Sequence, residues 1–233
     1  MTRVTDQPGI VVHTRPYRES SLLLSVLTLD HGLVTLVGRG VRGGRRGRAL
    51  QPFTELRLGW SGRSSLGTLA GFEVEKQHWF QGNALASAFY LTELITRLLD
   101  EREPHPRLFA GVRWALGEMD RGPSFVLRSF EKLLLEELGY GLDFEQDVGG
   151  DPLQPGAYYR LVPDQGFSRL RRIGADNGAE SRGVDGALLL EMGKGEFSDL
   201  RVRRAAKGVF GEALAGHLGP RPLLSRQLLV GQG

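Results

Sequence analysis

Glycine and arginine alternate between Val37 and Phe53, where the sequence reads VGRGVRGGRRGRALQPF. Gly38, Gly40 and Gly43 have the spacing G-x-G-x-x-G, which in dinucleotide-binding proteins forms a loop that holds a pyrophosphate. The five arginines could instead bind several phosphates, because a guanidinium keeps its charge and donates two parallel hydrogen bonds. The pattern therefore leaves three interpretations: a cofactor loop, a nucleic-acid-binding segment or a solvated linker.

The residues after Gly43 argue against the cofactor loop, which requires a helix directly after the glycines. Gly44 and Gly47 would fall in the first turns of that helix and Pro52 follows closely, so we expect no helix here. The next residues, FTELRLGW, alternate in the manner of a β-strand. We therefore predict that the arginine segment, defined as residues 39–48, is a loop between strands that binds nucleic acid, with a solvated linker as the alternative.

Other patterns that could support catalysis or metal binding are weak in this chain. The sequence has no cysteine, which excludes disulfides, thiolate nucleophiles and cysteine-ligated zinc. Its five histidines are widely separated, and none has a partner at a spacing typical of metal ligands. We therefore expect a protein that is not an enzyme, with no catalytic residue, no metal site and no cofactor.

Composition indicates a folded protein with local basic clusters. The chain has 233 residues, 40% of them hydrophobic, which is enough to bury a core. It lacks the run of roughly 18 apolar residues of a membrane helix, and its N-terminus lacks a signal-peptide pattern, so we expect a cytoplasmic protein with no membrane partner. Formal net charge is only +3, and local clusters on such a chain are typical of a polyanion-binding face.

Five segments before residue 80 have the pattern of short strands separated by turns. They are residues 9–19, 21–30, 33–37, 53–60 and 65–75. Pro16 in the first suggests an edge, a bend or a bulge. Five such strands predict a small closed or partly open barrel with an oligonucleotide-binding (OB) fold, whose aromatic residues stack on bases or fill the core. Its candidate aromatic platforms are Tyr17, Phe53, Trp60 and Phe72.

The apolar spacing changes to a helical period near residue 80 and predicts an α-helical remainder. We expect helices near residues 85–99, 108–119, 124–138, 185–192 and 199–218, with two short strands around a turn at residues 164–166 and an apolar tail that packs back on the helices. The predicted fold class is α+β. The predicted domains are an OB fold at 1–80, an α-helical domain at 81–141 and 183–233, and an irregular/β insertion at 142–182.

Two further basic clusters lie on predicted helices. The stretch LRVRRAAKGVFGEAL places four cations opposite an apolar face, although a solvent face of a packed helix is the alternative. The stretch RSFEKLLL places Arg128 and Lys132 beside Leu135, an arrangement that suits an acidic, apolar peptide tail. The candidate DNA-binding residues are Arg15, Arg18, Arg39, Arg42, Arg45, Arg46, Arg48, Arg57, Arg63, Arg201, Arg203, Arg204 and Lys207.

Taken together, these segments resemble the RecO family of DNA repair proteins. The resemblance begins in RPYRESSLLLSVLTLDHGLVTLVGRGVRG and ALQPFTELRLGWSGR, continues in FVLRSFEKLLLEELGYGLDF and YYRLVPDQGF, and ends in HLG-x-RPLLSR. It implies a recombination mediator that binds single- and double-stranded DNA, anneals complementary strands, and works with RecR to load RecA. It also implies that the helical part, at Arg128, Lys132 and Leu135, binds the C-terminal tail of single-stranded DNA-binding protein.

The chain departs from many members of that family at one point. Those relatives carry a four-cysteine zinc site near the stretch that corresponds to residues 147–169, whereas this chain has no cysteine. It therefore resembles a zinc-less branch whose insertion is held by packing. The alternatives to a DNA-binding mediator are a protein–protein adaptor and an RNA-binding OB-fold protein.

Overall fold

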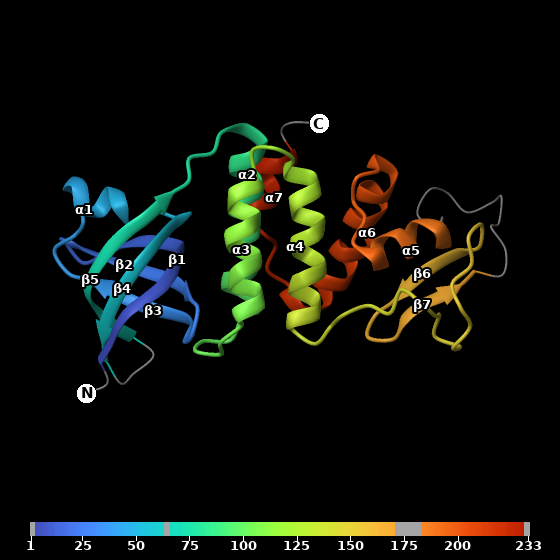
Figure 1. Cartoon of the computed structure of the whole chain (residues 1–233), viewed down its shortest axis with the longest axis horizontal. Coiled ribbons are helices and arrows are strands. Elements are labelled where there is room, and N and C mark those ends of the chain that lie inside the picture. The colour runs from blue at the N-terminus through green and yellow to red at the C-terminus, as the bar shows by residue number, and fades with distance from the viewer. Residues whose placement is uncertain (1–2, 63–65, 171–182, 231–233) are drawn as a thin grey trace. The chain divides into compact units, whose positions relative to one another are not determined.

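A computed structural model describes residues 3–62, 66–170 and 183–230 (Figure 1). It contains a five-stranded barrel, helices and a small sheet, so the predicted α+β class is confirmed. The chain divides into two compact units: residues 1–123 together with 222–233, and residues 124–221. The domain boundaries predicted from the sequence remain predictions.

The barrel is closed and OB-like, with the strand order β1-β2-β3-β5-β4. Its strands are β1 (Arg3–Tyr17), β2 (Ser21–Thr28), β3 (Gly32–Gly38), β4 (Thr54–Ser61) and β5 (Leu66–Gln77). Neighbouring strands are antiparallel except β3 and β5, which are parallel. Closure pairs the strand edges that an open sheet would expose, which gives the loops at its ends a rigid support.

Alternating apolar residues build the barrel core, because successive side chains of a strand point to opposite faces. Leu22 and Leu24 of β2 and Leu56 and Leu58 of β4 belong to one buried cluster. Pro16 lies where β1 pairs with β2 only, since β1 pairs with β4 no further than Val11. Of the edge, bend or bulge that the sequence suggested at Pro16, the pairing corresponds to an edge.

A short helix, α1 (Gly44–Ala49), replaces the loop that we predicted after Gly43. Its sequence has poor helix propensity, but other parts of the chain bind its last carbonyl oxygens. The Gln51 side chain donates to the Gly47 oxygen at 2.9 Å, and the Gln77 side chain donates to the Arg48 oxygen at 3.2 Å. The prediction of no helix was wrong because side chains beyond the helix, the nearby Gln51 and the distant Gln77 of β5, satisfy carbonyl groups that the helix leaves open.

The first unit also contains α2 (Gly82–Leu98), α3 (Pro106–Glu118) and α7 (Ser225–Val230). Helix α7 packs on α2, which confirms that the apolar tail returns to the helices. The Glu93 carboxylate of α2 accepts hydrogen bonds from the backbone N–H groups of Leu224 and Ser225, at 2.9 and 2.8 Å. This carboxylate binds the start of α7 to α2.

The second unit combines helices with a three-stranded sheet of order β7-β6-β8. Its elements are α4 (Pro123–Glu137), β6 (Tyr158–Val162), β7 (Gly166–Arg169), β8 (Val184–Asp185), α5 (Gly186–Lys194) and α6 (Leu200–Leu218). The predicted turn between β6 and β7 is confirmed, with Asp164 and Gly166 at positive φ. Asp185 and Asp199 accept hydrogen bonds at the N-termini of α5 and α6, as capping residues do.

Candidate nucleic-acid interface

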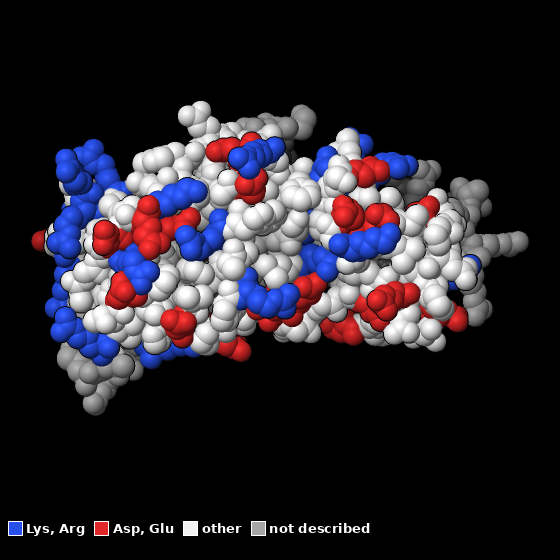
Figure 2. All heavy atoms as spheres, viewed as in Figure 1, with Lys and Arg blue, Asp and Glu red and all other residues white. Residues whose placement is uncertain are grey.

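The arginine segment lies on the surface of the barrel. Arg45, Arg46 and Arg48 are exposed on α1, and Arg39 and Arg42 are exposed on the loop that precedes it. Figure 2 shows Lys and Arg side chains along the edge of the barrel where Figure 1 places α1. The structure thus gathers the predicted arginines on one exposed part of the barrel.

Backbone contacts fix the arginine segment to the turn between β1 and β2. The Arg42 N–H donates to the Ser20 oxygen at 2.9 Å, and the Arg42 guanidinium donates to the Arg18 oxygen at 3.1 Å. Gly47 packs so closely that a Cβ atom there would lie 2.4 Å from the Val41 carbonyl oxygen. Arg18, predicted from a distant part of the sequence, is therefore adjacent to the segment.

A concavity of about 510 Å³ separates α1 from the hairpin of β1 and β2. Thr14 and Leu22 lie on its strand side, and Arg42, Gly44 and Arg48 lie on its α1 side. Glycine leaves backbone accessible there, while the arginines supply donors for phosphate. This geometry suits a sugar–phosphate backbone better than a buried cofactor.

The dinucleotide interpretation is also unsupported by the surroundings of the glycine motif, although a helix does follow it. A dinucleotide fold needs a parallel strand–helix–strand unit. Here the motif connects β3 to β4, and these strands belong to a closed barrel in which antiparallel pairs predominate. The glycines serve the path of the segment over the barrel: Gly40 and Gly43 have positive φ, and a Cβ atom at Gly38 would lie 2.8 Å from a methyl carbon of Val41.

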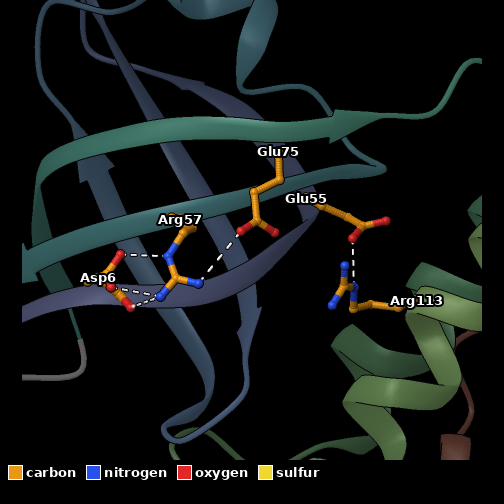
Figure 3. A network of polar contacts seen from close by, with 5 residues as sticks. All are labelled: Asp6, Glu55, Arg57, Glu75 and Arg113. Atoms are coloured by element: carbon orange, nitrogen blue, oxygen red, sulfur yellow. Dashed lines mark hydrogen bonds and ion pairs between the residues drawn. The ribbon is translucent and has the colours of Figure 1, made fainter.

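Arg57 is engaged by carboxylates, unlike the arginines of α1 (Figure 3). Its guanidinium donates to both Asp6 carboxylate oxygens, at 2.6 and 2.7 Å, and lies 3.7 Å from Glu75. The hydrogen bond from Arg57 lowers the pKa of Asp6 below its usual value, so the carboxylate stays charged. Arg57 is thus a weaker candidate for phosphate binding, and Arg63 lies outside the described residues.

Two of the four candidate aromatic platforms belong to the core. Trp60 is 7% exposed within the barrel cluster, and Phe53 is 5% exposed and packs edge-on against Phe80 and Phe89. Phe72 is half-buried, with the Arg46 guanidinium 5.5 Å from its ring centroid. Tyr17 is also half-buried, and the Arg18 guanidinium lies 5.3 Å from the centroid of its ring. Tyr17 and Phe72 thus support neighbouring arginines.

The second basic cluster, on α6, has three exposed cations, Arg201, Arg204 and Lys207. Arg201 forms an ion pair with Asp199 at 2.8 Å. Arg203 is half-buried and donates to the Phe197 carbonyl oxygen at 2.7 Å, so it serves the N-terminus of α6. Half of the predicted cluster is therefore occupied by local contacts.

The candidate peptide-binding residues lie on α4 with carboxylates beside two of them. Arg128 is 6% exposed and donates to Glu131 at 2.7 Å, and Lys132 contacts Glu136. Leu135 is 1% exposed. These carboxylates lie three and four residues after the cations, which is the spacing at which side chains of one helix meet.

Sequence reasoning missed a buried polar network on the barrel. Glu55, which alternates with core residues of β4, is only 4% exposed. Its carboxylate lies 2.8 Å from the His78 ring. It also accepts a hydrogen bond from Arg113 of α3 at 2.7 Å, which Figure 3 shows. No local pattern predicts this site, because its members are 23 and 58 residues from Glu55 along the chain.

Neither a metal-binding cluster nor a membrane-spanning helix occurs in the described residues. Within residues 3–62, 66–170 and 183–230, no three histidine, aspartate or glutamate side chains are grouped so that they could hold a metal ion. In the same part of the chain, no helix has both the length and the apolar character needed to cross a bilayer.

Comparisons with known proteins match nearly the whole chain to one family. Residues 1–78 match the family model described as Recombination protein O N terminal, and residues 80–227 match Recombination protein O C terminal. The chain is 40% identical to DNA repair protein RecO of Cellvibrio japonicus over 98% of both proteins. It is 40% identical to that of Stutzerimonas stutzeri (96% of this chain, 93% of the relative) and 37% identical to that of Pseudomonas aeruginosa PAO1 (99% and 97%).

Proposed function

The chain belongs to the RecO family of DNA repair and recombination proteins, and on that premise we propose that it anneals complementary DNA strands and, with RecR, helps to load RecA. The family consists of non-enzymatic recombination mediators and implies DNA binding. The cluster of exposed arginines on α1 and the adjoining β1–β2 turn is the observation that carries the proposal.

In this proposal the arginine segment binds phosphates of single- and double-stranded DNA without reading sequence, as contacts to the DNA backbone do. Two complementary strands repel each other through their phosphates. Several guanidinium groups held on one surface lower that repulsion, so the strands can approach and pair. Arg15 and Arg18 of the β1–β2 hairpin extend the surface, and Arg204 and Lys207 of α6 supply a separate contact.

The protein partners in this proposal are RecR and the C-terminal tail of single-stranded DNA-binding protein, which α4 would bind. Of the Arg128 guanidinium, Nε and Nη1 are buried and lack a hydrogen-bond partner among the described residues. Buried donors of this kind are costly when unpaired. A peptide carboxylate would supply the missing acceptor and compete with Glu131. Leu135 is 1% exposed, so α4 would have to shift before that side chain could contact the tail.

We also propose that the chain belongs to the zinc-less branch of its family. The loop before β6 is held by carboxylates and aromatic rings. Asp143 accepts from the Glu145 N–H at 2.8 Å, and Asp147 accepts from the Gly149 N–H at 2.8 Å. Phe144 packs against Phe167 with ring centroids 5.4 Å apart. These contacts would stabilise the loop in place of a bound metal ion.

A salt titration of DNA binding tests the arginine segment. Replacing Arg42, Arg45, Arg46 and Arg48 by alanine should weaken binding to single-stranded DNA. It should also flatten the plot of log affinity against log salt by about 0.7 for each phosphate that the variant no longer neutralises. Arg57→Ala is the matched control, because Asp6 and Glu75 already engage that guanidinium. An unchanged slope in the fourfold variant contradicts the assignment.

Parallel titrations with RNA and with the acidic tail peptide separate the alternatives. A clear preference for RNA over DNA of the same sequence would favour an RNA-binding protein. Binding of the peptide with no binding of either nucleic acid would favour a protein–protein adaptor. The proposal expects binding of DNA and of the peptide, with Arg128→Ala weakening only the peptide.

A further inference from the structure

Trp79 is an exposed aromatic side chain beside the barrel. It is 75% exposed, more than any other exposed large hydrophobic side chain of the described residues. Tryptophan is on average a well-buried residue in folded proteins. A large ring held in solvent is therefore a feature of binding surfaces, and nothing in the barrel core uses this one.

The backbone of Trp79 is held by buried residues on both sides. His78 is 9% exposed, its ring contacts Glu55, and its N–H donates to the Phe53 oxygen at 3.2 Å. Phe80 is also 9% exposed, and its ring stacks on that of His78 with centroids 5.9 Å apart. With its neighbours fixed in the interior, the Trp79 ring is presented to solvent on a rigid support.

Trp79 lies two residues beyond the end of β5, and this end of the strand contacts the arginine segment. Gln77, two residues earlier, donates from its side chain to the Arg48 carbonyl oxygen at 3.2 Å. Lys76 beside it is exposed. The exposed ring therefore belongs to a residue two positions from a direct contact with α1, the helix that carries Arg45, Arg46 and Arg48.

A cationic surface with an exposed ring has the chemistry of a single-strand binding site. Arginines hold the phosphates, and an aromatic side chain stacks on an unpaired base, whichever base it is. A protein partner offering an apolar side chain would gain nothing from the adjoining cations of α1. An unpaired base carries its own phosphate, so it can use the ring and the cations together.

We propose that Trp79 is a stacking platform for an unpaired base of single-stranded DNA. The inference rests on the proposed function, because the arginine segment must hold the phosphates beside it. The platform acts only on a strand whose bases are free, since the bases of a duplex are already stacked on each other. Trp79 thus gives the barrel a preference for single strands that phosphate contacts alone do not provide.

The test uses the full chain and two oligonucleotides of equal length and charge, oligo(dT) and an abasic strand. The variants are Trp79→Ala and Trp79→Phe, with Trp114→Phe as the matched control, because Trp114 is a 42% exposed tryptophan of the same unit. The chain has three tryptophans, and Trp60 is buried, so quenching of the intrinsic fluorescence by bound DNA reports on the exposed rings of Trp79 and Trp114. Affinity is measured over a range of salt concentrations for both strands and for duplex DNA.

Stacking predicts that oligo(dT) quenches the fluorescence of the wild type and of Trp114→Phe, and that Trp79→Phe loses this signal. Trp79→Ala should bind oligo(dT) roughly tenfold more weakly, whereas Trp79→Phe should stay near the wild type. The salt slope and the duplex affinity should not change, because stacking neutralises no phosphate. Removing the bases should weaken binding by the wild type but not by Trp79→Ala.

The outcomes distinguish this inference from the function it rests on. If Trp79→Ala keeps full affinity for oligo(dT) while the arginine variant loses it, Trp79 is no platform and the phosphate-binding function stands. The inference is likewise overturned if the ring contributes equally to both strands. If the wild type binds neither strand, the proposed function itself fails. Loss of RecR binding in Trp79→Ala with DNA affinity intact would assign the ring to a protein partner and overturn the inference.

Discussion

The individual charged side chains of the barrel differ in what they can still bind. Arg57 and Arg46 are both arginines of the barrel, yet Arg57 lies between two carboxylates and Arg46 lies over the Phe72 ring. An ion pair already satisfies a guanidinium, whereas a ring supports it and leaves its donors open to phosphate. Whether an arginine forms an ion pair or lies over a ring therefore depends on residues that are distant in the sequence.

The buried Glu55 carboxylate should contribute to the stability of the protein. Glu55→Ala should lower the free energy of unfolding by about 2 kcal/mol, because the buried His78 ring loses its partner and Arg113 loses its acceptor. Urea unfolding measures the change, with Glu75→Gln as a control for loss of a more exposed carboxylate. Equal stability of the Glu55 variant and the wild type would show that the network contributes nothing net.

At the scale of elements, the helices differ in what stabilises them. Helices α5 and α6 begin at aspartate caps and carry apolar faces, so local sequence explains them. Helix α1 has neither a side-chain cap nor good propensity, and depends on Gln51 and Gln77 for its last carbonyls. The position of the α1 arginines therefore depends partly on a contact with β5, which is distant in the sequence.

The docking of α7 on α2 predicts a dependence on pH. Burial raises the pKa of Glu93, but hydrogen bonds from the Ser225 side chain and from the N–H groups of Ser225 and Leu224 outweigh it, and the pKa is lowered on balance. A lowered pKa in the folded state stabilises above the unfolded value of about 4.5, and this contribution is lost as pH falls below it.

Replacing Glu93 by glutamine should therefore destabilise the protein at neutral pH, by about 1 kcal/mol. The difference from the wild type should shrink as the pH falls below about 4.5. Denaturant unfolding at a series of pH values measures it, and Glu212→Gln on α6 serves as an exposed control. A difference that is constant across the series would mean that the Glu93 charge does not hold α7.

At the scale of the molecule, the second unit must hold its sheet without cysteine ligands. We predict that a zinc chelator leaves the thermal unfolding midpoint unchanged. Phe167→Ala should lower the free energy of unfolding by roughly 3 kcal/mol, because it removes a ring that is 1% exposed against Phe144. Calorimetry of the wild type with and without chelator tests the first statement, and calorimetry of the Phe167→Ala variant tests the second. A midpoint that falls on chelation would reveal a metal and contradict the packing account.

Local sequence patterns were enough to predict the class of the fold and most of its elements. Strand alternation, the turn at residues 164–166 and the caps of α5 and α6 depend on neighbouring residues, so they can be read without knowing the fold. The resemblance in five stretches pointed to the RecO family, which the comparisons confirm along the whole chain. The arginine segment was also recognisable, since its residue types alone suit phosphate.

Which of those residues can bind a ligand depends on the folded chain. The tertiary structure formed α1 where local sequence argued for a loop, buried Glu55 and Trp60, and placed Asp6 against Arg57, 51 residues away. It also left Trp79 in solvent, although both residues beside it are buried. The physical reason is that exposure and ion pairing depend on residues brought together from distant parts of the chain, which no local pattern encodes.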